Sequence, residues 1–263
     1  MDSGQNFALH SEDWTRRLIL WVGRRSRHLF NRLISSSSLL GDPSVFDPRS
    51  LPWTHMIEDH WRQIRRELDA VLAYREYLPA VQEISPDHSR IARERQWTSF
   101  FLYGYGTRSA ANCERCPVTA RLVGQIPGLQ SAFFSILNPG AHLPRHRGVT
   151  KAMLTYHLGL KVPNDPACWI RVEDQEYRWG EGHSFLFDDT RPHEVRNDSK
   201  DERVVLLIQV NRPLRPPGAW FADFFLGAVK KSPFIRDAVA NQRAWEAGFV
   251  RQLNDWRDTR RSA

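Results

Sequence analysis

Residues 131–162 read SAFFSILNPGAHLPRHRGVTKAMLTYHLGLKV, and in this stretch the spacing of apolar residues changes from helical to strand-like. Further short apolar runs follow, separated by turn residues such as Asn138-Pro-Gly140 and Asn197-Asp-Ser199. The expected strands lie at residues 133–137, 153–162, 169–172, 184–187 and 204–210. Short strands at this spacing predict a mainly β fold with flanking helices, either a sandwich or a closed jelly roll.

Helical patterns flank the strand region on both sides. Apolar residues that recur every three or four positions predict an amphipathic helix; they are Ile57, Trp61, Ile64, Leu68 and Val71. Pro117 is expected to open a short helix, and Pro233 to lie in the first turn of a C-terminal helix that Ser232 caps. Residues 76–110 show no clear period and are expected to be irregular.

The composition suits a single catalytic domain with extensions, since 41% of the 263 residues are hydrophobic. We expect a basic N-terminal segment (1–40), a catalytic domain (41–213, with its β core at about 131–213) and a C-terminal helical extension (214–263). The formal net charge is +7, and residues 14–34 carry six arginines and no acids among Trp, Leu and Ile. If helical, this stretch either lies on an anionic membrane or packs on the core with a solvated basic face. No zinc-finger, RNA-binding or helix-turn-helix pattern is present, so nucleic acid is not an expected partner.

The cysteines favour a reducing compartment. Cys113, Cys116 and Cys168 are too few for a disulfide framework. The first two form a CxxC, but a zinc site needs about four ligands and no second CxxC exists, so incidental thiols are the favoured interpretation. The first dozen residues are polar and include acids, so no secretory signal is expected, and the apolar run 18–22 is too short to span a bilayer. We therefore expect a cytoplasmic protein with at most peripheral membrane contact.

Several histidines lie in the strand region, and the order of two of them relative to an arginine is informative. His146 is expected in a turn between two strands, His193 follows the run 184–187, and Arg203 opens the last apolar strand. A histidine in a strand-rich core is more often structural than metal-binding. A jelly-roll oxygenase, however, takes one histidine from an early strand, one from a late strand, and a cation from the next strand for the carboxylate of a co-substrate. Imidazole suits Fe(II), which must keep open positions for its other ligands.

Short motifs in a particular order make the chain resemble the aspartyl/asparaginyl β-hydroxylase family. They are SILNPGAHLPRHRGVT (135–150), YHLGL (156–160), WGEG (179–182), FDDTRPHEV (187–195) and Arg203. The segment DPRSLP (47–52) and the residues WRQIR (61–65) in the expected helix that follows are also similar to that family. The main resemblance covers roughly residues 97–213, and it is specific for the family rather than for the substrate.

The resemblance implies a double-stranded β-helix of the cupin-like jelly-roll type, with Fe(II), 2-oxoglutarate and O2 used to hydroxylate an unactivated C–H bond. Carried over motif by motif, it implies that His146 and His193 bind the iron. It also implies that Arg203 and Ser135 hold the distal carboxylate of 2-oxoglutarate, and that His157 contacts its metal-proximal end. A guanidinium suits the first task because it can bind a carboxylate in a bidentate manner.

The third ligand position of the wider oxygenase class is altered. Many of its members have a carboxylate two residues after the first histidine, where this chain has Gly148. The aspartyl hydroxylases are likewise built on two histidines, so water is expected to complete the site. Asp188 and Asp189 are candidates to orient that water or a substrate group, with Asp189 as the catalytic candidate. Capping of a strand end is the alternative role, equally favoured for Asp188 and disfavoured for Asp189.

The chain differs from the peptide hydroxylases of the family at positions that carry basic residues there. It has Phe133, Met153 and Thr155 instead, which argues against a strongly acidic peptide and favours an acyl-bearing lipid or an apolar metabolite, with an amino-acid or peptide residue still open. Lys151 or Arg147 could hold the proximal carboxylate of 2-oxoglutarate in place of residue 155. Two other functions are considered: a halogenase that binds halide beside the glycine of the third position, and a non-catalytic cupin-like binding domain.

Overall fold

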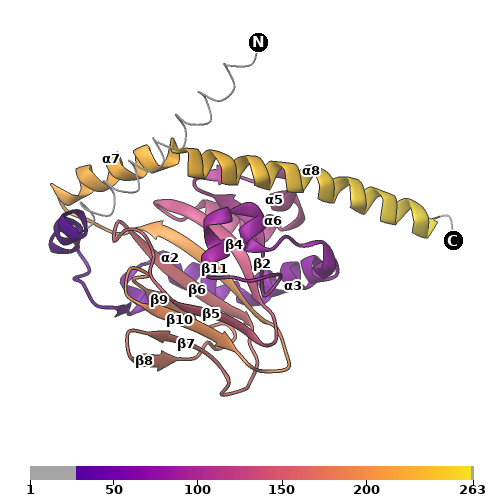
Figure 1. Ribbon diagram of the computed structural model, residues 1–263, viewed down its shortest axis with the longest axis horizontal. Helices are drawn as coiled ribbons and strands as arrows, with labels where there is room; N and C mark the ends of the chain where they lie inside the picture. The colour runs from indigo at the N-terminus through magenta and orange to yellow at the C-terminus, as the bar shows by residue number, and fades with distance from the viewer. Residues whose placement is uncertain (1–27, 262–263) are drawn as a thin grey trace, which may run out of the picture.

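Two antiparallel sheets face each other at the centre of the molecule (Figure 1). The computed structural model describes residues 28–261, and the side chains of all of these except Asp87, Phe234 and residues 250–261. Over this described part the larger sheet has the strand order β1 (Val45–Phe46), β9 (Ser184–Phe187), β6 (Met153–Lys161), β11 (Arg203–Asn211), β4 (Leu129–Leu137), β2 (Trp97–Gly104), β3 (Thr107–Arg108). The smaller sheet has the order β5 (Ala141–His146), β10 (His193–Asn197), β7 (Cys168–Val172), β8 (Gln175–Tyr177).

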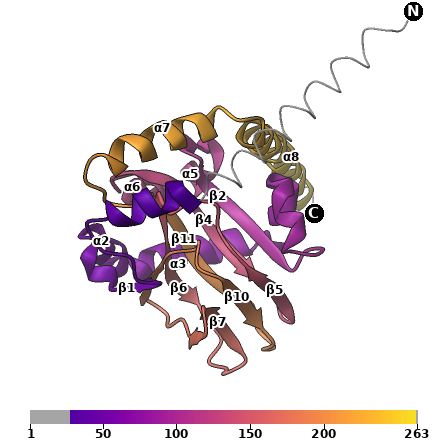
Figure 2. The same cartoon turned by 60° about the vertical axis from the view of Figure 1, so that its left-hand side comes forward.

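Helices cover the outer face of the larger sheet, as the two views in Figures 1 and 2 show. In chain order the helices of the described part are a helix at residues 28–36, η1 (Pro48–Ser50), α2 (Trp53–Asp59), α3 (Trp61–Leu72), η2 (Arg75–Tyr77), α4 (Val81–Ile84), η3 (Pro86–Arg90), α5 (Ala110–Arg115), α6 (Pro117–Gly124), α7 (Gly218–Lys230) and α8 (Pro233–Arg261). Of these, α2, α3, α5 and α6 pack on the outer face. The Glu67 carboxylate on α3 accepts hydrogen bonds from Val118 N and Thr119 N, both at 2.8 Å, which ties α3 to the start of α6.

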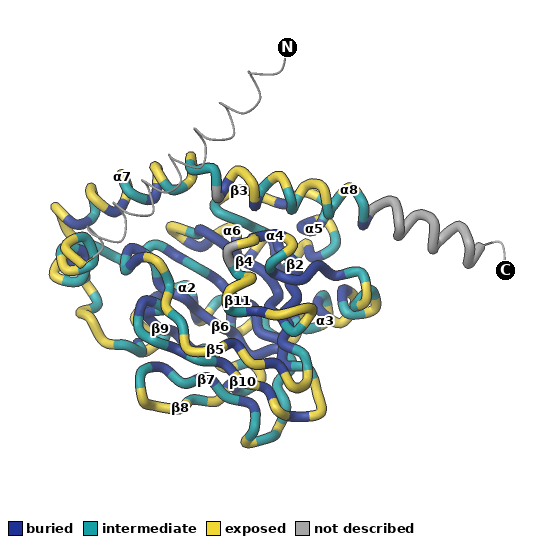
Figure 3. Tube along the Cα trace, viewed as in Figure 1, coloured by how far each residue is buried: buried dark blue, intermediate teal, exposed yellow. Residues whose placement is uncertain are grey.

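The two-residue repeat of the strands separates two cores. On β11, Val204, Leu206 and Ile208 face outward and pack under the helices. Val205 and Leu207 face inward, toward residues of the smaller sheet. Figure 3 shows the strands of the larger sheet buried along most of their length, because both faces are covered. Inward positions of this sheet are therefore the ones that can build an enclosed site.

The mainly β, jelly-roll prediction is confirmed, and so are the five strands expected from the sequence, which correspond to β4, β6, β7, β9 and β11. The expected stripe helix is present as α2 and α3, with His60 between them. Helices α6 and α8 begin at Pro117 and Pro233 as expected. The division into an N-terminal segment, a catalytic domain and a helical extension stays a prediction, since residues 1–27 lie outside the described residues.

Two expectations were wrong. Residues 76–110 are not irregular, because they contain β2, which pairs with β4 along most of its length. All residues from Trp97 to Leu102 are buried, so β2 lacks the alternation of apolar and polar residues by which a strand is recognised in a sequence. His146 was expected in a turn, and it is instead the last residue of β5.

The helix at residues 28–36 includes the described end of the basic segment at 14–34. Its Ile34 is fully buried in a small core with Ala152, Ala222 and Leu226. Of the two arrangements expected for the basic segment, this end therefore has the one that packs on the core. Residues 14–27 lie outside the described residues.

Candidate active site

His146 and His193 come from neighbouring strands and meet at one end of the smaller sheet. His146 ends β5, His193 begins β10, and the two residues are direct partners across the strand pair. Their ring centroids are 4.1 Å apart, with planes at 55°. A register irregularity follows His193 on β10, of the kind that redirects side chains next to active sites. The fold thus brings together the two histidines that the sequence singled out.

Hydrogen bonds set the orientation of both imidazoles. His146 Nδ1 lies 2.7 Å from Pro144 O, and His193 Nδ1 lies 3.0 Å from Arg191 O. Because a carbonyl oxygen only accepts, each Nδ1 must carry the hydrogen, which leaves a lone pair on each Nε2. Histidine ligands of metals are oriented in this way, through a hydrogen bond from the other ring nitrogen.

Both imidazoles are held in the neutral form that metal binding requires. Burial lowers the pKa of His146 below its ordinary value. Burial together with the neighbouring His146 lowers the pKa of His193 to about 4. Near pH 7 the pair therefore offers two uncharged nitrogen donors at one point.

Arg203 is a buried cation at the start of β11. Its exposed fraction is 2%, and its guanidinium carbon lies 4.5 Å from the ring centroid of Trp179. Its Nη1 is 3.5 Å from Ser135 O, and its Nε has no hydrogen-bond partner. Among the described residues no carboxylate forms an ion pair with it, and burial lowers its pKa to about 10. A buried charge without a counter-ion is costly, so this position fits an anionic ligand.

Ser135 and His157 lie on the same inner face as Arg203. Ser135 on β4 is the partner of Val205, and His157 on β6 is the partner of Leu207, so both stand at inward positions. Ser135 Oγ accepts a hydrogen bond from Trp97 Nε1 at 2.9 Å, so its own hydrogen can be directed to another group.

His157 connects the cation to the histidine pair. Its Nδ1 accepts a hydrogen bond from Trp179 Nε1 at 3.1 Å, so the ring hydrogen is on Nε2. Burial, followed by the charges of Arg203 and His193, lowers the pKa of His157 well below its ordinary value. Ring contacts link the neutral His157 to both groups, because Trp179 contacts it and Arg203, and Phe187 contacts it and His193.

Asp189 fills the space beside Gly148. A Cβ added to Gly148 would lie 2.1 Å from Asp189 Oδ1, and Gly148 N donates to Asp189 O at 2.6 Å. Thr155 Oγ1 also donates to Asp189 Oδ2 at 3.2 Å. A side chain at position 148 would therefore need Asp189 to move. Within the described chain no group of three or more His, Cys, Asp or Glu residues is arranged to hold a metal, so Asp189 lies beside the histidine pair rather than as its third member.

Asp188 serves the fold rather than the histidine pair. Its fully buried carboxylate binds Arg212 Nη2 and Lys151 Nζ, both at 2.6 Å, and caps the turn at Thr190. Lys151 also binds Asp42 Oδ1 at 2.5 Å. Asp188 therefore fits the alternative role at a strand end. Lys151, which the sequence offered as a residue to hold the proximal carboxylate of 2-oxoglutarate, already binds two carboxylates of the protein.

Sequence reasoning assigned no role to Trp179, although its motif was noted. The indole both covers the Arg203 guanidinium and hydrogen-bonds His157, so it holds two candidate ligand-binding groups. Phe187 lies 5.3 Å from the ring centroids of both His157 and His193, and Phe133 stacks on Phe101 at 4.3 Å. The walls of the site are therefore largely aromatic.

Cys113 and Cys116 lie away from this site, in the core under the helices. Cys113 and Cys116 are buried and free, and burial raises the pKa of both thiols. Such thiols are poor nucleophiles, as the incidental interpretation of the CxxC expected.

The chain is similar in sequence to a known family and to several of its members. The sequence profile of the aspartyl/asparaginyl beta-hydroxylase family matches residues 58–213. The ornithine lipid ester-linked acyl 2-hydroxylase of Rhizobium tropici is 39% identical over 221 residues, which cover 83% of this chain and 78% of that protein. The human aspartyl/asparaginyl beta-hydroxylase is 29% identical over 178 residues, 65% of this chain, but the match spans only 23% of the human protein. Among solved structures, a Pseudomonas putida prolyl-4-hydroxylase matches 58% of this chain and 87% of its own, with 21% identity and a TM-score of 0.38.

The uncompensated charge of Arg203 leads to a stability prediction. Arg203→Met should leave the ligand-free protein as stable as the wild type or more stable, because it removes an unpaired buried charge. We expect 2-oxoglutarate to raise the melting temperature of the wild type in the presence of Mn(II), and the same change should abolish that rise. Thermal unfolding with and without 2-oxoglutarate measures both effects.

Arg171→Met is the matched control, because that arginine lies on β7 with a partly exposed side chain. It should keep the stabilisation by 2-oxoglutarate. Stabilisation that survives in Arg203→Met but is lost in Arg171→Met would contradict the assignment.

Proposed function

The chain belongs to the aspartyl/asparaginyl β-hydroxylase family, and from that membership we propose that it hydroxylates a C–H bond in the acyl chain of an amino-acid-containing lipid. It is a hydroxylase of the jelly-roll type, and the finer assignment concerns its cofactors and substrate. The observation that carries the proposal is the unpaired guanidinium of Arg203, enclosed in the same site as two neutral imidazoles.

The donor set fits Fe(II) and 2-oxoglutarate. His146 and His193 would hold the metal through Nε2, the nitrogen that their hydrogen bonds leave unprotonated. Arg203 and the Ser135 hydroxyl would hold the distal carboxylate, and His157 Nε2–H would donate to the metal-proximal end. When bound, iron would activate O2, which is the oxidant: one oxygen atom would enter the substrate C–H bond and the other would convert 2-oxoglutarate to succinate and carbon dioxide.

The remaining residues of the site orient the ligand-binding groups and keep bulk water away from them. Trp179 fixes the Arg203 guanidinium by stacking and fixes His157 by its indole N–H, so both are pre-oriented for a ligand. Asp189 provides an acceptor beside Gly148, where it can orient a water at the third position of the metal. The aromatic wall of Phe187, Phe185 and Phe133 excludes bulk water from this space.

The substrate assignment rests on the alignments with relatives and on the uncharged side chains at positions that are basic in the peptide hydroxylases. The lipid acyl hydroxylase of Rhizobium tropici aligns with most of both chains, whereas the human peptide-type relative aligns with less than a quarter of its own length. Phe133 belongs to the inner core and suits an alkyl chain, whereas Met153 packs against the Ile34 core, and neither offers a charge to an acidic peptide. Thr155 donates its hydroxyl to Asp189, so it too presents no cation.

The alternatives fit less well. A halide beside Gly148 would face the Asp189 carboxylate, and the two negative charges would repel. A binding domain without catalysis would have no use for an oriented histidine pair, whose free nitrogens point to metal chemistry.

Contact with a membrane surface would bring such a substrate within reach, and residues 14–34, with six arginines and no acids, suit anionic headgroups. Over the described residues, none of the helices combines the length and the apolar character that crossing a bilayer demands. The proposed contact is therefore peripheral.

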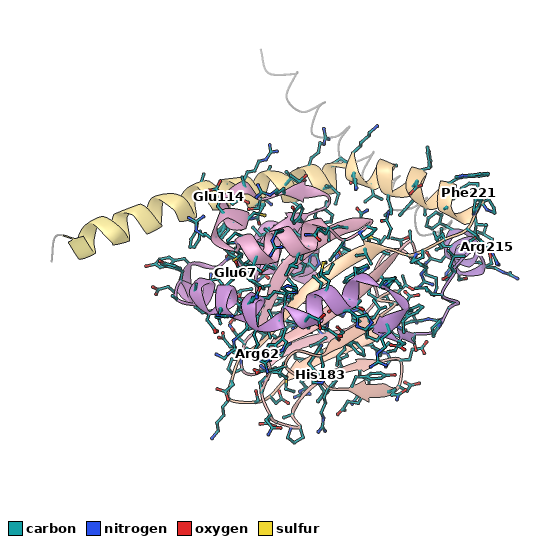
Figure 4. The ribbon with its side chains drawn as sticks, turned by 180° about the vertical axis from the view of Figure 1, so that it is seen from behind. Arg62, Glu67, Glu114, His183, Arg215 and Phe221 are labelled. Atoms are coloured by element: carbon teal, nitrogen blue, oxygen red, sulfur yellow. The ribbon has the colours of Figure 1, made fainter. Side chains whose placement is uncertain are left out.

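Metal binding should depend on the histidine pair. His146→Ala and His193→Ala should each lose tight Fe(II) binding and succinate formation, because one imidazole cannot hold the metal in an open site. Metal content after gel filtration and succinate release measure the two effects. His183→Ala is the control, since this exposed histidine outside the site (Figure 4) should be dispensable. Near-normal turnover in both site variants would refute the metal assignment.

Substrate class can be separated by stimulation of succinate release. Detergent-solubilised ornithine lipid should stimulate it, and mass spectrometry should find one added oxygen on the acyl chain. A peptide containing Asp or Asn should have little effect, because the wall lacks cations for it. Strong stimulation by the peptide, with none by the lipid, would assign the chain to peptide hydroxylation instead.

A further inference from the structure

Large apolar side chains that are mostly exposed gather in one region of the described chain. They are Leu29, Leu39, Val149, Trp220, Phe221 and Phe224, with exposed fractions between 52% and 78%. They belong to the helix at residues 28–36 and the turn after it, to α7, and to the loop that follows His146. We call this surface the aromatic face. Soluble proteins seldom expose a cluster of large apolar side chains without a binding role.

The elements of the aromatic face are packed together. Phe30 contacts Phe225 of α7 with ring centroids 4.6 Å apart. Arg215 N donates to Ser37 O at 2.9 Å, and Leu39 N donates to Pro213 O at 3.0 Å. Figures 1 and 2 show the 28–36 helix beside α7 in both views.

Helix α7 presents its aromatic residues outward because its inner face is already satisfied. Ala222 and Leu226, four residues apart, are buried against Ile34. Trp220 and Phe224, also four residues apart, lie on the opposite, exposed side. Figure 3 shows exposed and more buried stretches alternating along α7, and Figure 4 shows Phe221 at the outer edge of the molecule.

The charges around the aromatic face indicate which kind of partner binds there. Exposed cations flank α7 at Arg215 before it and at Lys230 and Lys231 at its end, and Arg32 lies on the neighbouring helix. Asp223 is the one acid in the α7 sequence. A second copy of the chain would bring like charges together, whereas anionic headgroups would complement them. Trp and Phe with flanking Lys and Arg are the composition of surfaces that insert into membrane interfaces.

One short loop joins the aromatic face to the candidate active site, and we place the entrance of the site at this loop. The loop after His146 carries the exposed Val149 and continues to Lys151, whose N donates to Asn31 Oδ1 at 3.1 Å. Ala152 at the end of that loop packs on Ile34. The short connection from a candidate metal ligand to the aromatic face joins the two surfaces.

We infer that α7, the 28–36 helix and the loop after His146 form a docking face for an anionic lipid bilayer, with Trp220, Phe221 and Phe224 inserted among the headgroups. Docking in this orientation presents the entrance of the site to the acyl region of the membrane. This second statement rests on the proposed lipid hydroxylation, whereas the binding of the face to the bilayer does not.

Co-sedimentation of the full-length protein with vesicles tests the inference. The wild type should bind vesicles of phosphatidylcholine mixed with phosphatidylglycerol, and bind pure phosphatidylcholine vesicles more weakly. Trp220→Ser/Phe224→Ser should weaken binding to the mixed vesicles by roughly tenfold or more, since two large apolar anchors are lost. Both residues are exposed, so the melting temperature should not change. Asp223→Asn, on the same helix, should bind at least as tightly as the wild type.

Three results would overturn the inference. The double variant could bind mixed vesicles as the wild type does. Vesicle binding could be lost only when the arginines at 16, 17, 24 and 25 are replaced, which would assign it to residues 14–27. The wild type could be a dimer in solution that the double variant dissociates, which would identify the aromatic face as a self-association surface.

Succinate release distinguishes this inference from the proposed function. The double variant should lose activity on lipid in vesicles and keep activity on detergent-solubilised lipid. A wild type that binds mixed vesicles through the aromatic face, yet hydroxylates no lipid in either form, would refute the proposed substrate and leave the docking face in place.

Discussion

The guanidinium of Arg203 is a cation held in the interior with no described carboxylate to neutralise it, and much of the surrounding structure follows from that condition. Interior charges persist when something compensates for lost hydration, and here the Trp179 ring and one backbone carbonyl compensate only in part. The two-residue repeat of β4, β6 and β11 places Ser135 and His157 on the same inner face. We therefore propose that the site receives an anion, whose negative charge would neutralise Arg203.

The sequence predicted those parts that depend on local patterns or on motif order. Strands such as β9 follow from short apolar runs between turns, whereas β2 was missed because both of its faces are buried. The proximity of His146 and His193 was expected from their order along the chain, and their joint role with Arg203 stays a prediction. The role of Trp179 and the ion pair between Asp188 and Arg212 could not be predicted, because each depends on a partner far away in sequence.

The Gly148 position shows how one local exchange shapes the chemistry. Where a carboxylate side chain would begin, the Asp189 carboxylate from the neighbouring loop already stands. The negative group therefore stays close to the histidine pair but belongs to a different segment, where it can orient water. On the other side of His146, the loop toward Lys151 connects this centre to the aromatic face, so ligand chemistry and the proposed membrane docking share one short stretch of chain.

The central claim is that His146 and His193 bind Fe(II) in the same site in which Arg203 anchors 2-oxoglutarate. Anaerobic titration of the Fe(II)-loaded protein with 2-oxoglutarate tests it directly, because a 2-oxo acid chelated to Fe(II) gives a visible charge-transfer absorption. The account predicts that this absorption saturates at an equimolar ratio in the wild type. It should be absent from the His146→Ala/His193→Ala double variant, and it should need far more 2-oxoglutarate in Arg203→Met. No absorption in the wild type, or equal absorption in the double variant, would contradict the account.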